Sequence, residues 1–324
     1  MAAKPKEEVD EESDYYSITD QEREIMKKRR DYILHYKPPV WTSPSPDPVS
    51  GIPTTIPKVL HANIVFFGPI GSGKSSLIGS LCRAVNQLSS FPERVLQTLR
   101  VNHPDSHGTQ NWLETPGNPS KTIIYQDTRG DTDMSNQERM KHDFSLRGIY
   151  KDEAPMGDVP FYSKHWWTSQ RFFWERSLSD VPHTVVFVFD GSSEPFLDQE
   201  SLSFFKTIFE DCTKYGYEPI IVITHLDLIC RTAQREGKNW EIEVHHKKDK
   251  VLQAFEDLHL TRKSIYFVTN FNRGGDRGSI PLWQSSDRGF DKVNKTMIDL
   301  SRDLLSIANR FIDRHYGHKR CCLI

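Results

Sequence analysis

The sequence predicts an α/β fold with a doubly wound, mostly parallel sheet. Two observations support this fold class. Apolar runs of strand length alternate repeatedly with stretches of helical periodicity along most of the chain, a pattern typical of strand–helix–strand units in a parallel sheet. The run HTVVFVFD at residues 183–190 is apolar almost throughout, as expected of a central strand that helices cover on both faces.

The 324 residues divide into three parts. Residues 1–57 are an N-terminal extension, with an acidic and partly disordered start, a short charged helix near residues 20–36 and a proline-rich linker. Residues 58–316 are expected to form the folded domain, which a long, irregular and aromatic-rich insert interrupts at residues 131–182. Residues 317–324 form a C-terminal tail.

The elements of the folded domain can be placed in chain order. Strands are expected at residues 64–67, 95–101, 121–126, 183–190, 219–223 and 264–268. Helices are expected at residues 76–87, 198–215, 242–258 and 291–315, where apolar residues recur at helical spacing. A polar loop is expected at residues 102–120. Because ligands of such sheets bind at the carboxyl ends of the strands, the residues that follow each strand are the candidates for a site.

Composition and charge narrow the class of protein. The 42 basic and 44 acidic side chains leave a net charge of −2, which gives no indication of a nucleic-acid partner. The 5 cysteines form no C-x-x-C pair and are too scattered for a disulfide framework, so a reducing compartment is expected. The chain starts without an apolar signal-peptide core, Ala2 excludes N-myristoylation, and no apolar run reaches membrane-spanning length. These observations predict a cytoplasmic protein, or one held on the cytosolic face of a membrane.

Residues 68–75 read GPIGSGKS and match the phosphate-binding pattern G-x-x-x-x-G-K-S. They lie between an expected strand and an expected helix, so backbone N–H groups and the helix N-terminus would hold a polyphosphate. Lys74 would reach the β- and γ-phosphates, and the Ser75 hydroxyl would bind Mg²⁺. A chance match in a Gly/Ser loop is the alternative, and the flanking strand and helix argue against it. The nucleotide-binding residues predicted here are Gly68, Gly71, Ser72, Gly73, Lys74, Ser75 and Ser76.

Residues 127–130 read DTRG and follow the strand expected at 121–126. This D-x-x-G form occurs at a strand end in P-loop switch proteins. Asp127 would bind Mg²⁺ directly or through water, because this metal prefers hard oxygen ligands. The Gly130 N–H would contact a γ-phosphate and so couple the nucleotide to the next segment. An aspartate-rich turn would look the same, so the prediction depends on the position after the P-loop helix.

Residues 224–227 read THLD, which is similar to the guanine-specificity pattern [NT]-K-x-D with His225 in place of the lysine. The Asp227 carboxylate would accept hydrogen bonds from guanine N1–H and the exocyclic amine, whereas adenine would leave it unpaired at a cost. Thr224 and His225 are expected to belong to the same site. The alternative is an aspartate that caps the next turn. Asn270, in VTN at residues 268–270, marks the expected last base-contacting loop.

Two further positions bear on switching and hydrolysis. A threonine between the P-loop and Asp127 is expected to bind Mg²⁺ when a γ-phosphate is present. Thr109 is preferred because it lies in the polar, glycine-containing loop, and Thr115 is the alternative.

Asp131 stands where many small GTPases carry a water-positioning glutamine. Its shorter, charged side chain would repel the γ-phosphate, so intrinsic hydrolysis is predicted to be slow.

Taken in order, these motifs resemble those of the interferon-induced protein forty-four family. The segments that carry the resemblance are NIVFF and GPIGSGKSS at residues 63–76, DTRG at 127–130, VFVFDGSS at 186–193, ITHLD at 223–227 and VTNF at 268–271. The resemblance covers roughly residues 57–312 and implies a dynamin-like or Ras-like P-loop G domain, GTP binding and a link to innate defence. The T-H-x-D form is typical of the family, and efficient hydrolysis is not implied. The segment before residue 57 is too short and polar for the β-rich domain that often precedes the family's G domain.

Two features lie outside these motifs. The aromatic cluster at residues 166–174 has two interpretations, the core of an inserted helix or a surface for a homodimer or a protein effector. The chain ends KRCCLI, which fits C-a-a-X with Cys321 as the prenylated residue and also resembles a doubly lipidated C-C-x-x terminus. Such a lipid would provide a membrane partner, and a chance cysteine pair is the alternative.

The predicted function is a guanine-nucleotide-binding protein that acts as a GTP- and Mg²⁺-dependent switch, with slow or partner-dependent hydrolysis. GTP or GDP and Mg²⁺ are the expected cofactors. Conversion of GTP to GDP and phosphate is the reaction that such a site would carry out, and no catalytic residue is assigned to it. Two alternatives stay open. One is a nucleotide-locked scaffold without turnover, and the other is an ATP-using P-loop enzyme, for which no acceptor site is apparent.

Overall fold

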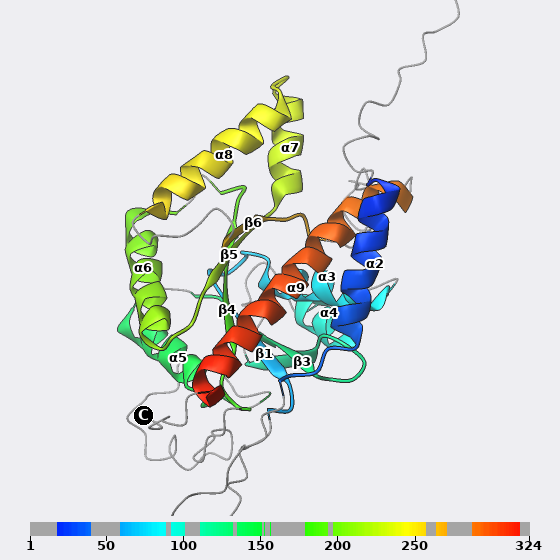
Figure 1. Cartoon of the computed structure of the whole chain (residues 1–324). Helices are drawn as coiled ribbons and strands as arrows, with labels where there is room; N and C mark the ends of the chain where they lie inside the picture. The colour runs from blue at the N-terminus through cyan, green and yellow to red at the C-terminus, as the bar shows by residue number, and fades with distance from the viewer. Residues whose placement is uncertain are drawn as a thin grey trace, which may run out of the picture.

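The computed structural model describes residues 18–39, 59–88, 92–100, 111–131, 135–150, 152, 156, 179–193, 197–256, 264–270 and 287–317. Its strands are β1 (Ala62–Phe67), β2 (Leu113–Pro116), β3 (Ile123–Asp127), β4 (Thr184–Asp190), β5 (Ile220–Thr224) and β6 (Ile265–Phe267). Its helices are α2 (Asp20–Leu34), α3 (Lys74–Asn86), α4 (Glu93–Arg100), α5 (Asn136–Leu146), α6 (Gln199–Lys214), α7 (Leu226–Arg235), α8 (Trp240–Ala254) and α9 (Asp287–Gly317). Figure 1 labels these elements.

The strands form one six-stranded sheet in the order β2-β3-β1-β4-β5-β6. All neighbours are parallel except the edge pair β2 and β3, which is antiparallel. Strand β1 has β3 as its neighbour on one side and β4 on the other. The later strands are therefore added first on one side of β1 and then on the other, and the strand order reverses at β1. In a doubly wound sheet a ligand binds at such a reversal, outside the carboxyl ends of the strands. The predicted fold class is confirmed.

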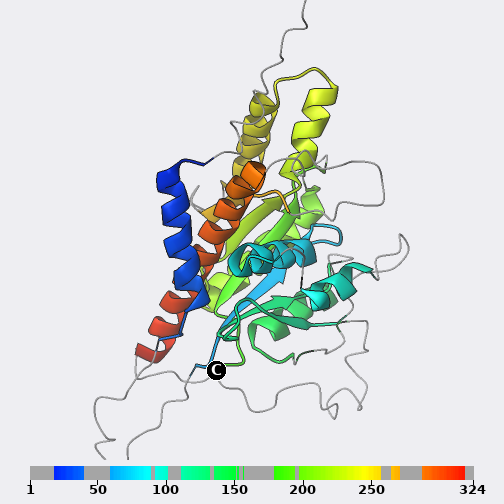
Figure 2. The same cartoon turned by 90° about the vertical axis from the view of Figure 1, so that its right-hand side faces the viewer.

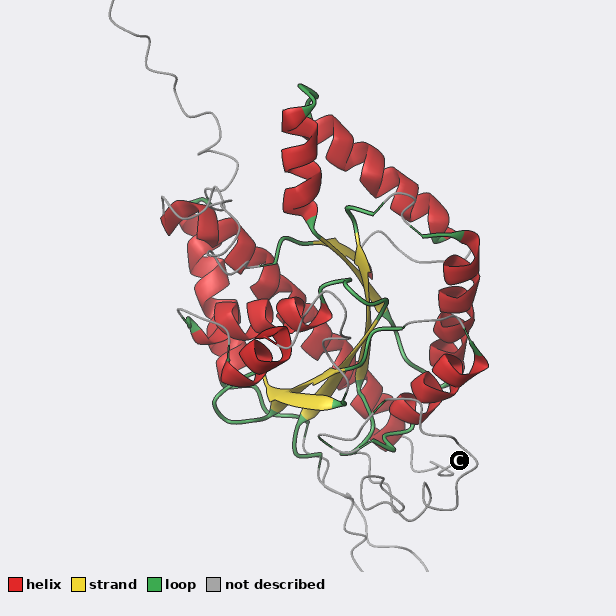
Figure 3. Cartoon of the chain, turned by 180° about the vertical axis from the view of Figure 1, so that it is seen from behind, coloured by secondary structure: helices red, strands yellow, loops and turns green. Residues whose placement is uncertain are grey.

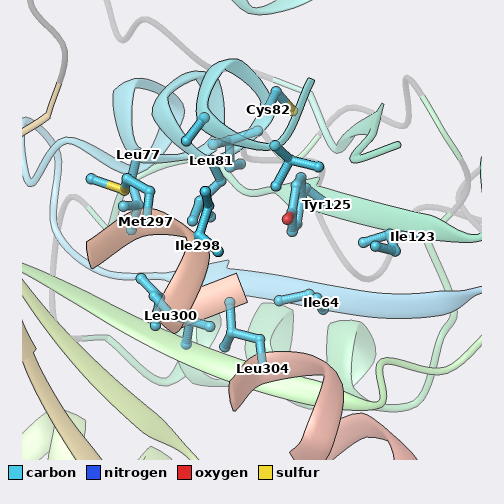
Figure 4. Close-up of a cluster of buried hydrophobic side chains, with 14 of the residues drawn as sticks. Ile64, Leu77, Leu81, Cys82, Ile123, Tyr125, Met297, Ile298, Leu300 and Leu304 are labelled. Carbon is cyan, nitrogen blue, oxygen red and sulfur yellow. The ribbon is translucent and has the colours of Figure 1, made fainter. Parts of the chain in front are cut away.

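Helices cover both faces of the sheet (Figure 3). Successive side chains of a strand point to opposite faces, and in β1 Ile64 and Phe66 belong to one hydrophobic cluster while Val65 and Phe67 belong to the other. The first cluster also contains side chains of α2, α3, α4 and α9, and the second contains side chains of α5, α6 and α8. Figure 4 shows part of the first cluster, where Leu77 and Leu81 of α3 lie beside Met297 and Ile298 of α9 on the same face of the sheet.

Helix α2 packs along α9 (Figures 1 and 2). Thr19 and Glu22 form a capping box at its start, which satisfies N–H groups that the first turn leaves free. Met26 and Ile33 are buried in the first hydrophobic cluster. The helix is therefore present as predicted, and it rests on the folded domain. The domain boundaries drawn from the sequence, at residues 58 and 316, stay predictions.

The strand predicted at residues 95–101 is wrong, because this segment forms α4. Val95 and Leu96 are both buried in the first cluster. The pattern ERVLQTLR places its apolar residues at helical spacing. The second strand is instead β2, which lies inside the predicted polar loop at residues 102–120. Its short polar sequence has no strand pattern of its own, and pairing with β3 gives it strand conformation.

Besides α4, two further helices were not expected. The insert at residues 131–182, predicted to be irregular, contains α5, whose start is capped by the Ser135 hydroxyl. Helix α7 begins immediately after β5, within the THLD motif. In the part of the chain that the structure describes, no helix combines the length and apolar character needed to cross a bilayer.

Candidate nucleotide-binding site

The loop between β1 and α3 has the backbone that the P-loop prediction requires. Gly68 has φ 144°, and a Cβ at this position would lie 2.1 Å from the Val188 carbonyl oxygen. Gly73 has φ 86°, and a Cβ there would approach Asn270 Nδ2 to 2.9 Å. Both positions combine a left-handed conformation with close packing, so only glycine fits without a shift of its surroundings. The loop is thereby pressed against the ends of β4 and β6.

Lys74 begins α3, and its side chain is only 6% exposed. Its ammonium group donates hydrogen bonds to the carbonyl oxygens of Gly68 (2.8 Å) and Pro69 (2.9 Å). Burial lowers the pKa of Lys74, and the nearby charges of Asp131 and Asp127 act in the opposite direction. The cation is therefore held inside the loop, where a phosphate oxygen would be a stronger partner than a neutral carbonyl.

Ser75 and Asp127 are in contact although they lie 52 positions apart in the sequence. The Ser75 hydroxyl donates a 2.5 Å hydrogen bond to Asp127 Oδ2. Asp127 ends β3 and is 4% exposed. A hydroxyl and a carboxylate are hard oxygen donors, and a P-loop serine with a strand-end aspartate is the donor set that holds Mg²⁺ in P-loop proteins. The two residues fit the predicted metal site.

The segment after β3 is closed on the P-loop. The Asp131 N–H donates to the Gly68 carbonyl (3.2 Å), and the Ile70 N–H donates to the Asp131 carbonyl (3.3 Å). A Cβ on Gly130 would lie 2.6 Å from Ile70 Cα, so the D-x-x-G glycine allows this approach. Gly130 is thus beside the loop, as its predicted contact with a phosphate requires.

The Asp131 side chain has a partner that the sequence did not reveal. Its Oδ1 lies 2.8 Å from Nε2 of His142 on α5, and both side chains are buried. The His142 ring also packs edge-on against Phe67, with centroids 4.3 Å apart. Our sequence-based prediction treated Asp131 as a free charge that faces the γ-phosphate, whereas the structure engages this carboxylate with α5. A single histidine in an insert carries no pattern that would have identified it.

The ends of β5 and β6 also hold the P-loop. Thr224 Oγ1 donates to the Ser72 carbonyl (2.7 Å), and Asn270 Nδ2 donates to the Gly73 carbonyl (3.3 Å). Both side chains are buried. The predicted base motif and the predicted phosphate loop are therefore in direct contact, and Thr224 and Asn270 act on the loop itself.

His225 connects the base motif to β4. Its Nδ1 lies 2.8 Å from Asp190 Oδ1, and Asp190 also accepts hydrogen bonds from the Ser192 N–H and hydroxyl. Burial acts to lower the pKa of His225, but the bond and charge of Asp190, with the charge of Asp227, outweigh it and raise the pKa. Burial acts to raise the pKa of Asp190, and its bonds to His225 and Ser192 lower it to about 2. Asp190 was missed, although it ends the strongest strand in the sequence.

Asp227 lies in the first turn of α7 and is 3% exposed. A carboxylate in a first turn interacts favourably with the helix N-terminus, as the alternative interpretation of this residue requires. The same position, at the carboxyl end of β5 and two residues after His225, suits a carboxylate that faces a base. Both interpretations are compatible with this geometry.

The remaining predicted residues divide into two groups. Gly71 and Ser76 lie in the loop and in the first turn of α3. Thr115, the alternative switch threonine, is buried on β2 opposite Tyr125, whereas Leu113 pairs with Asp127. The preferred Thr109, the aromatic cluster at residues 166–174 and Cys321 lie outside the described residues.

Comparisons with known proteins found one curated relative and two solved structures that are similar to this chain. No family model matches the chain. The chain is 25% identical over 262 residues to interferon-induced protein 44 of Mus musculus, which confirms a resemblance to that protein. The alignment covers 79% of the chain and 56% of the mouse protein, so the chain spans little more than half the length of this relative.

Two solved structures of the S. cerevisiae Ski7 GTPase-like domain are also similar to the chain. The form bound to GTP is 16% identical with a TM-score of 0.38, and the match covers 77% of this chain and 50% of that one. The form bound to GDP and inorganic phosphate is 15% identical with a TM-score of 0.39, and the match covers 82% and 52%. At these scores the match adds nothing to the topology described above.

Proposed function

We propose that the chain is a guanine-nucleotide-binding protein that holds GTP or GDP, with Mg²⁺, at the carboxyl end of its sheet. One observation carries the proposal: the Thr224 hydroxyl and the Asn270 amide bond to the P-loop carbonyls of Ser72 and Gly73. These contacts bring residues proposed to belong to the base side against the loop proposed to hold the phosphates, which supports a single site for a nucleoside polyphosphate.

Different residues of this site would bind the phosphates, the metal ion and the base. Lys74 would exchange its carbonyl partners for phosphate oxygens, and the loop N–H groups would hold the remaining phosphate charge. Ser75 and Asp127 would hold Mg²⁺, which neutralises phosphate charge when it is bound. Asp227 would accept two hydrogen bonds from guanine, which adenine does not offer, and so select the base.

The contacts of Asp131 support a switch. A γ-phosphate beside the P-loop would compete with the hydrogen bonds that join Gly68 and Ile70 to the Asp131 backbone. Movement of Asp131 would reach α5 through its bond to His142. Nucleotide state would thus alter the position of a helix, in the way that ordered segments report a γ-phosphate in other switches. Thr109 is our proposed switch ligand to Mg²⁺.

Hydrolysis is proposed to be slow. Asp131 occupies the place of the water-positioning glutamine, and its carboxylate is engaged by His142. An arginine finger supplied by a partner contributes about 10³–10⁵ in rate to GTPases, so turnover would depend on such a partner. A nucleotide-locked scaffold is the second candidate function. Single-turnover hydrolysis of GTP, with and without a purified partner protein that lacks GTPase activity of its own, separates them, because a locked scaffold shows no phosphate release in either.

Two wider roles remain proposals. The name of the mouse relative, interferon-induced protein 44, supports a link to innate immune response. A prenyl group on Cys321 would hold the protein on a cytosolic membrane face. Intact-mass measurement on the chain made in eukaryotic cells tests the lipid, because an unmodified C-terminus excludes it.

Equilibrium binding tests the proposed function. Affinities for GTP, GDP and ATP are measured with Mg²⁺ on the unmodified chain, with Lys74→Ala as the control for the phosphate site. We expect guanine nucleotides to bind more tightly than ATP, and Lys74→Ala to lose all three. Tighter binding of ATP would support the ATP-using alternative and exclude guanine selection.

A further inference from the structure

His225 has an unusual backbone for its position. It has φ 58°, one of three positive φ values at non-glycine residues in the part of the chain that the structure describes. Gln87, another of the three, ends α3, where a left-handed residue is common. His225 instead stands between β5 and α7, and its carbonyl accepts the N–H of Leu228 at the start of that helix. Strained backbone of this kind persists where surrounding contacts hold it, and it is frequent at ligand sites.

The contact that holds His225 comes from the neighbouring strand. Asp190 pairs with Thr224 in the register of β4 and β5, so the carboxylate lies one residue from His225 across the sheet. Asp190 is itself fixed by two hydrogen bonds from Ser192. The imidazole therefore has a defined orientation, with Nδ1 turned toward β4.

This orientation leaves part of the imidazole available. Nδ1 is occupied by Asp190, with Thr224 Oγ1 at 3.3 Å. Among the described residues, Nε2 has no hydrogen-bond partner. The side chain is 23% exposed. The ring is thus partly exposed two residues before the carboxylate proposed to bind the base, and its Nε2 is an acceptor when the imidazole is neutral and a donor when it is protonated.

We propose that His225, oriented by Asp190, contacts the guanine base and takes over both tasks of the lysine in the [NT]-K-x-D pattern, so that nucleotide affinity increases when its imidazole is protonated. This inference rests on the proposed function. The flat ring replaces the aliphatic stem that packs on the base, and the imidazolium replaces the ammonium. A cation over an aromatic face gains from the ring quadrupole, and the nucleotide's negative charge adds to the attraction.

The charged groups around His225 favour this protonation. Asp190 faces it from the end of β4, and Asp227 acts on it from the first turn of α7. In the part of the chain that the structure describes, no other charged group acts on the pKa of His225. The pKa of His225 is raised above its ordinary value. Affinity should therefore rise as pH falls through this raised pKa, and the change should lie at a higher pH than for an ordinary histidine.

The test measures the affinity for GDP with Mg²⁺ between about pH 8.5 and about pH 6, a range that spans histidine titration. We expect affinity to rise about threefold to thirtyfold as pH falls in the unmodified chain, the range between an exposed and a desolvated cation–π contact. His225→Lys should bind GDP with little dependence on pH, because its charge persists throughout. Asp190→Asn should shift the rise to lower pH. His245→Lys, on the exposed face of α8, is the matched control and should keep the unmodified profile.

Titration of the His225 imidazole by NMR, with and without GDP, needs no variant. Bound GDP should raise its pKa, because affinity and protonation are linked. An unchanged pKa, or a His225→Lys profile that follows the unmodified chain, would overturn the inference while leaving guanine binding intact. Absence of GDP binding across the whole range would overturn the proposed function and this inference together.

Discussion

The Asp131 carboxylate and the His142 imidazole form a buried contact of 2.8 Å that links the P-loop to α5. The backbone of Asp131 is bonded to the P-loop on one side, and its side chain reaches the helix on the other. A rearrangement at the phosphates would therefore be transmitted across a single residue. This contact is the structural basis of the proposed switch, and it can be tested without nucleotide.

Removal of His142 should destabilise the folded chain. In His142→Ala the buried Asp131 oxygen loses its partner, and an unsatisfied buried polar group costs about 1–3 kcal/mol. Urea denaturation of the nucleotide-free chain measures the change in the free energy of unfolding. His245→Ala, on the exposed face of α8, is the control and should stay within about 0.5 kcal/mol. Equal stability of the two variants would show that the contact is unimportant to the fold.

Gly68→Ala should damage the site through its Cβ. The added carbon would lie 2.1 Å from the Val188 carbonyl, so the loop or β4 must shift. Gly237→Ala is the matched control, because Gly237 also has positive φ but its Cβ would meet nothing within 4 Å. The control measures the cost of a left-handed alanine alone, about 1–2 kcal/mol. The melting temperature and the affinity for GTP should both fall further in Gly68→Ala than in Gly237→Ala. Similar losses in the two variants would contradict the steric argument.

Loss of the Ser75–Asp127 pair should remove the Mg²⁺ dependence of nucleotide binding. Outer-sphere partners of metal sites are worth about 10- to 100-fold in metal affinity, and a direct ligand should be worth at least as much. Titration of Mg²⁺ against the GTP complex of Ser75→Ala and Asp127→Asn measures this loss. Ser80→Ala, which removes a hydroxyl bonded to the Ser76 carbonyl, should bind Mg²⁺ normally. Normal Mg²⁺ affinity in Ser75→Ala would exclude this residue as a ligand.

The stability contributed by the Asp190–His225 pair should depend on pH at both ends. The pKa of Asp190 is lowered to about 2 in the folded chain, so its contribution is complete above about pH 4 and is lost as pH falls toward 2. The pKa of His225 is raised, so its contribution is complete below about pH 6.5 and is lost as pH rises through the raised value.

Urea denaturation of the unmodified chain and Asp190→Asn, compared at several pH values, measures this dependence. The difference in unfolding free energy should be largest between about pH 4 and about pH 6.5. It should shrink toward both lower and higher pH. A difference that is constant across this range would show that the pair contributes no ionic stabilisation.

Local patterns predicted the parts of the fold that they determine. The strands β1, β4 and β5 are buried along almost their whole length, and their apolar runs were visible in the sequence. The P-loop residues also came from one short segment, because loop and helix start are adjacent in the chain. In both cases the physical cause lies within a few residues.

Features that depend on distant partners were not predictable. Edge strand β2 owes its conformation to pairing with β3. The burial of Met26 and Ile33 depends on α9, whose Asp299 also pairs with Arg29 of the charged helix α2. In the candidate site, Asp190 and His142 gain their roles from His225 and Asp131 on other elements. The spacing of residues in the sequence does not indicate which distant residues come into contact, so these contacts could not be predicted.

Exchange of base specificity in Asp227→Asn tests guanine recognition most directly. The carboxylate would accept hydrogen bonds from guanine N1–H and its 2-amino group, whereas an asparagine amide donates and would suit xanthine, which carries an oxygen at that position. Affinities for GTP and xanthosine triphosphate are measured with Mg²⁺ in both chains. We predict that Asp227→Asn loses GTP affinity by at least about 100-fold and binds xanthosine triphosphate more tightly than GTP. Unchanged preference for GTP in Asp227→Asn would contradict the assignment of this site to guanine.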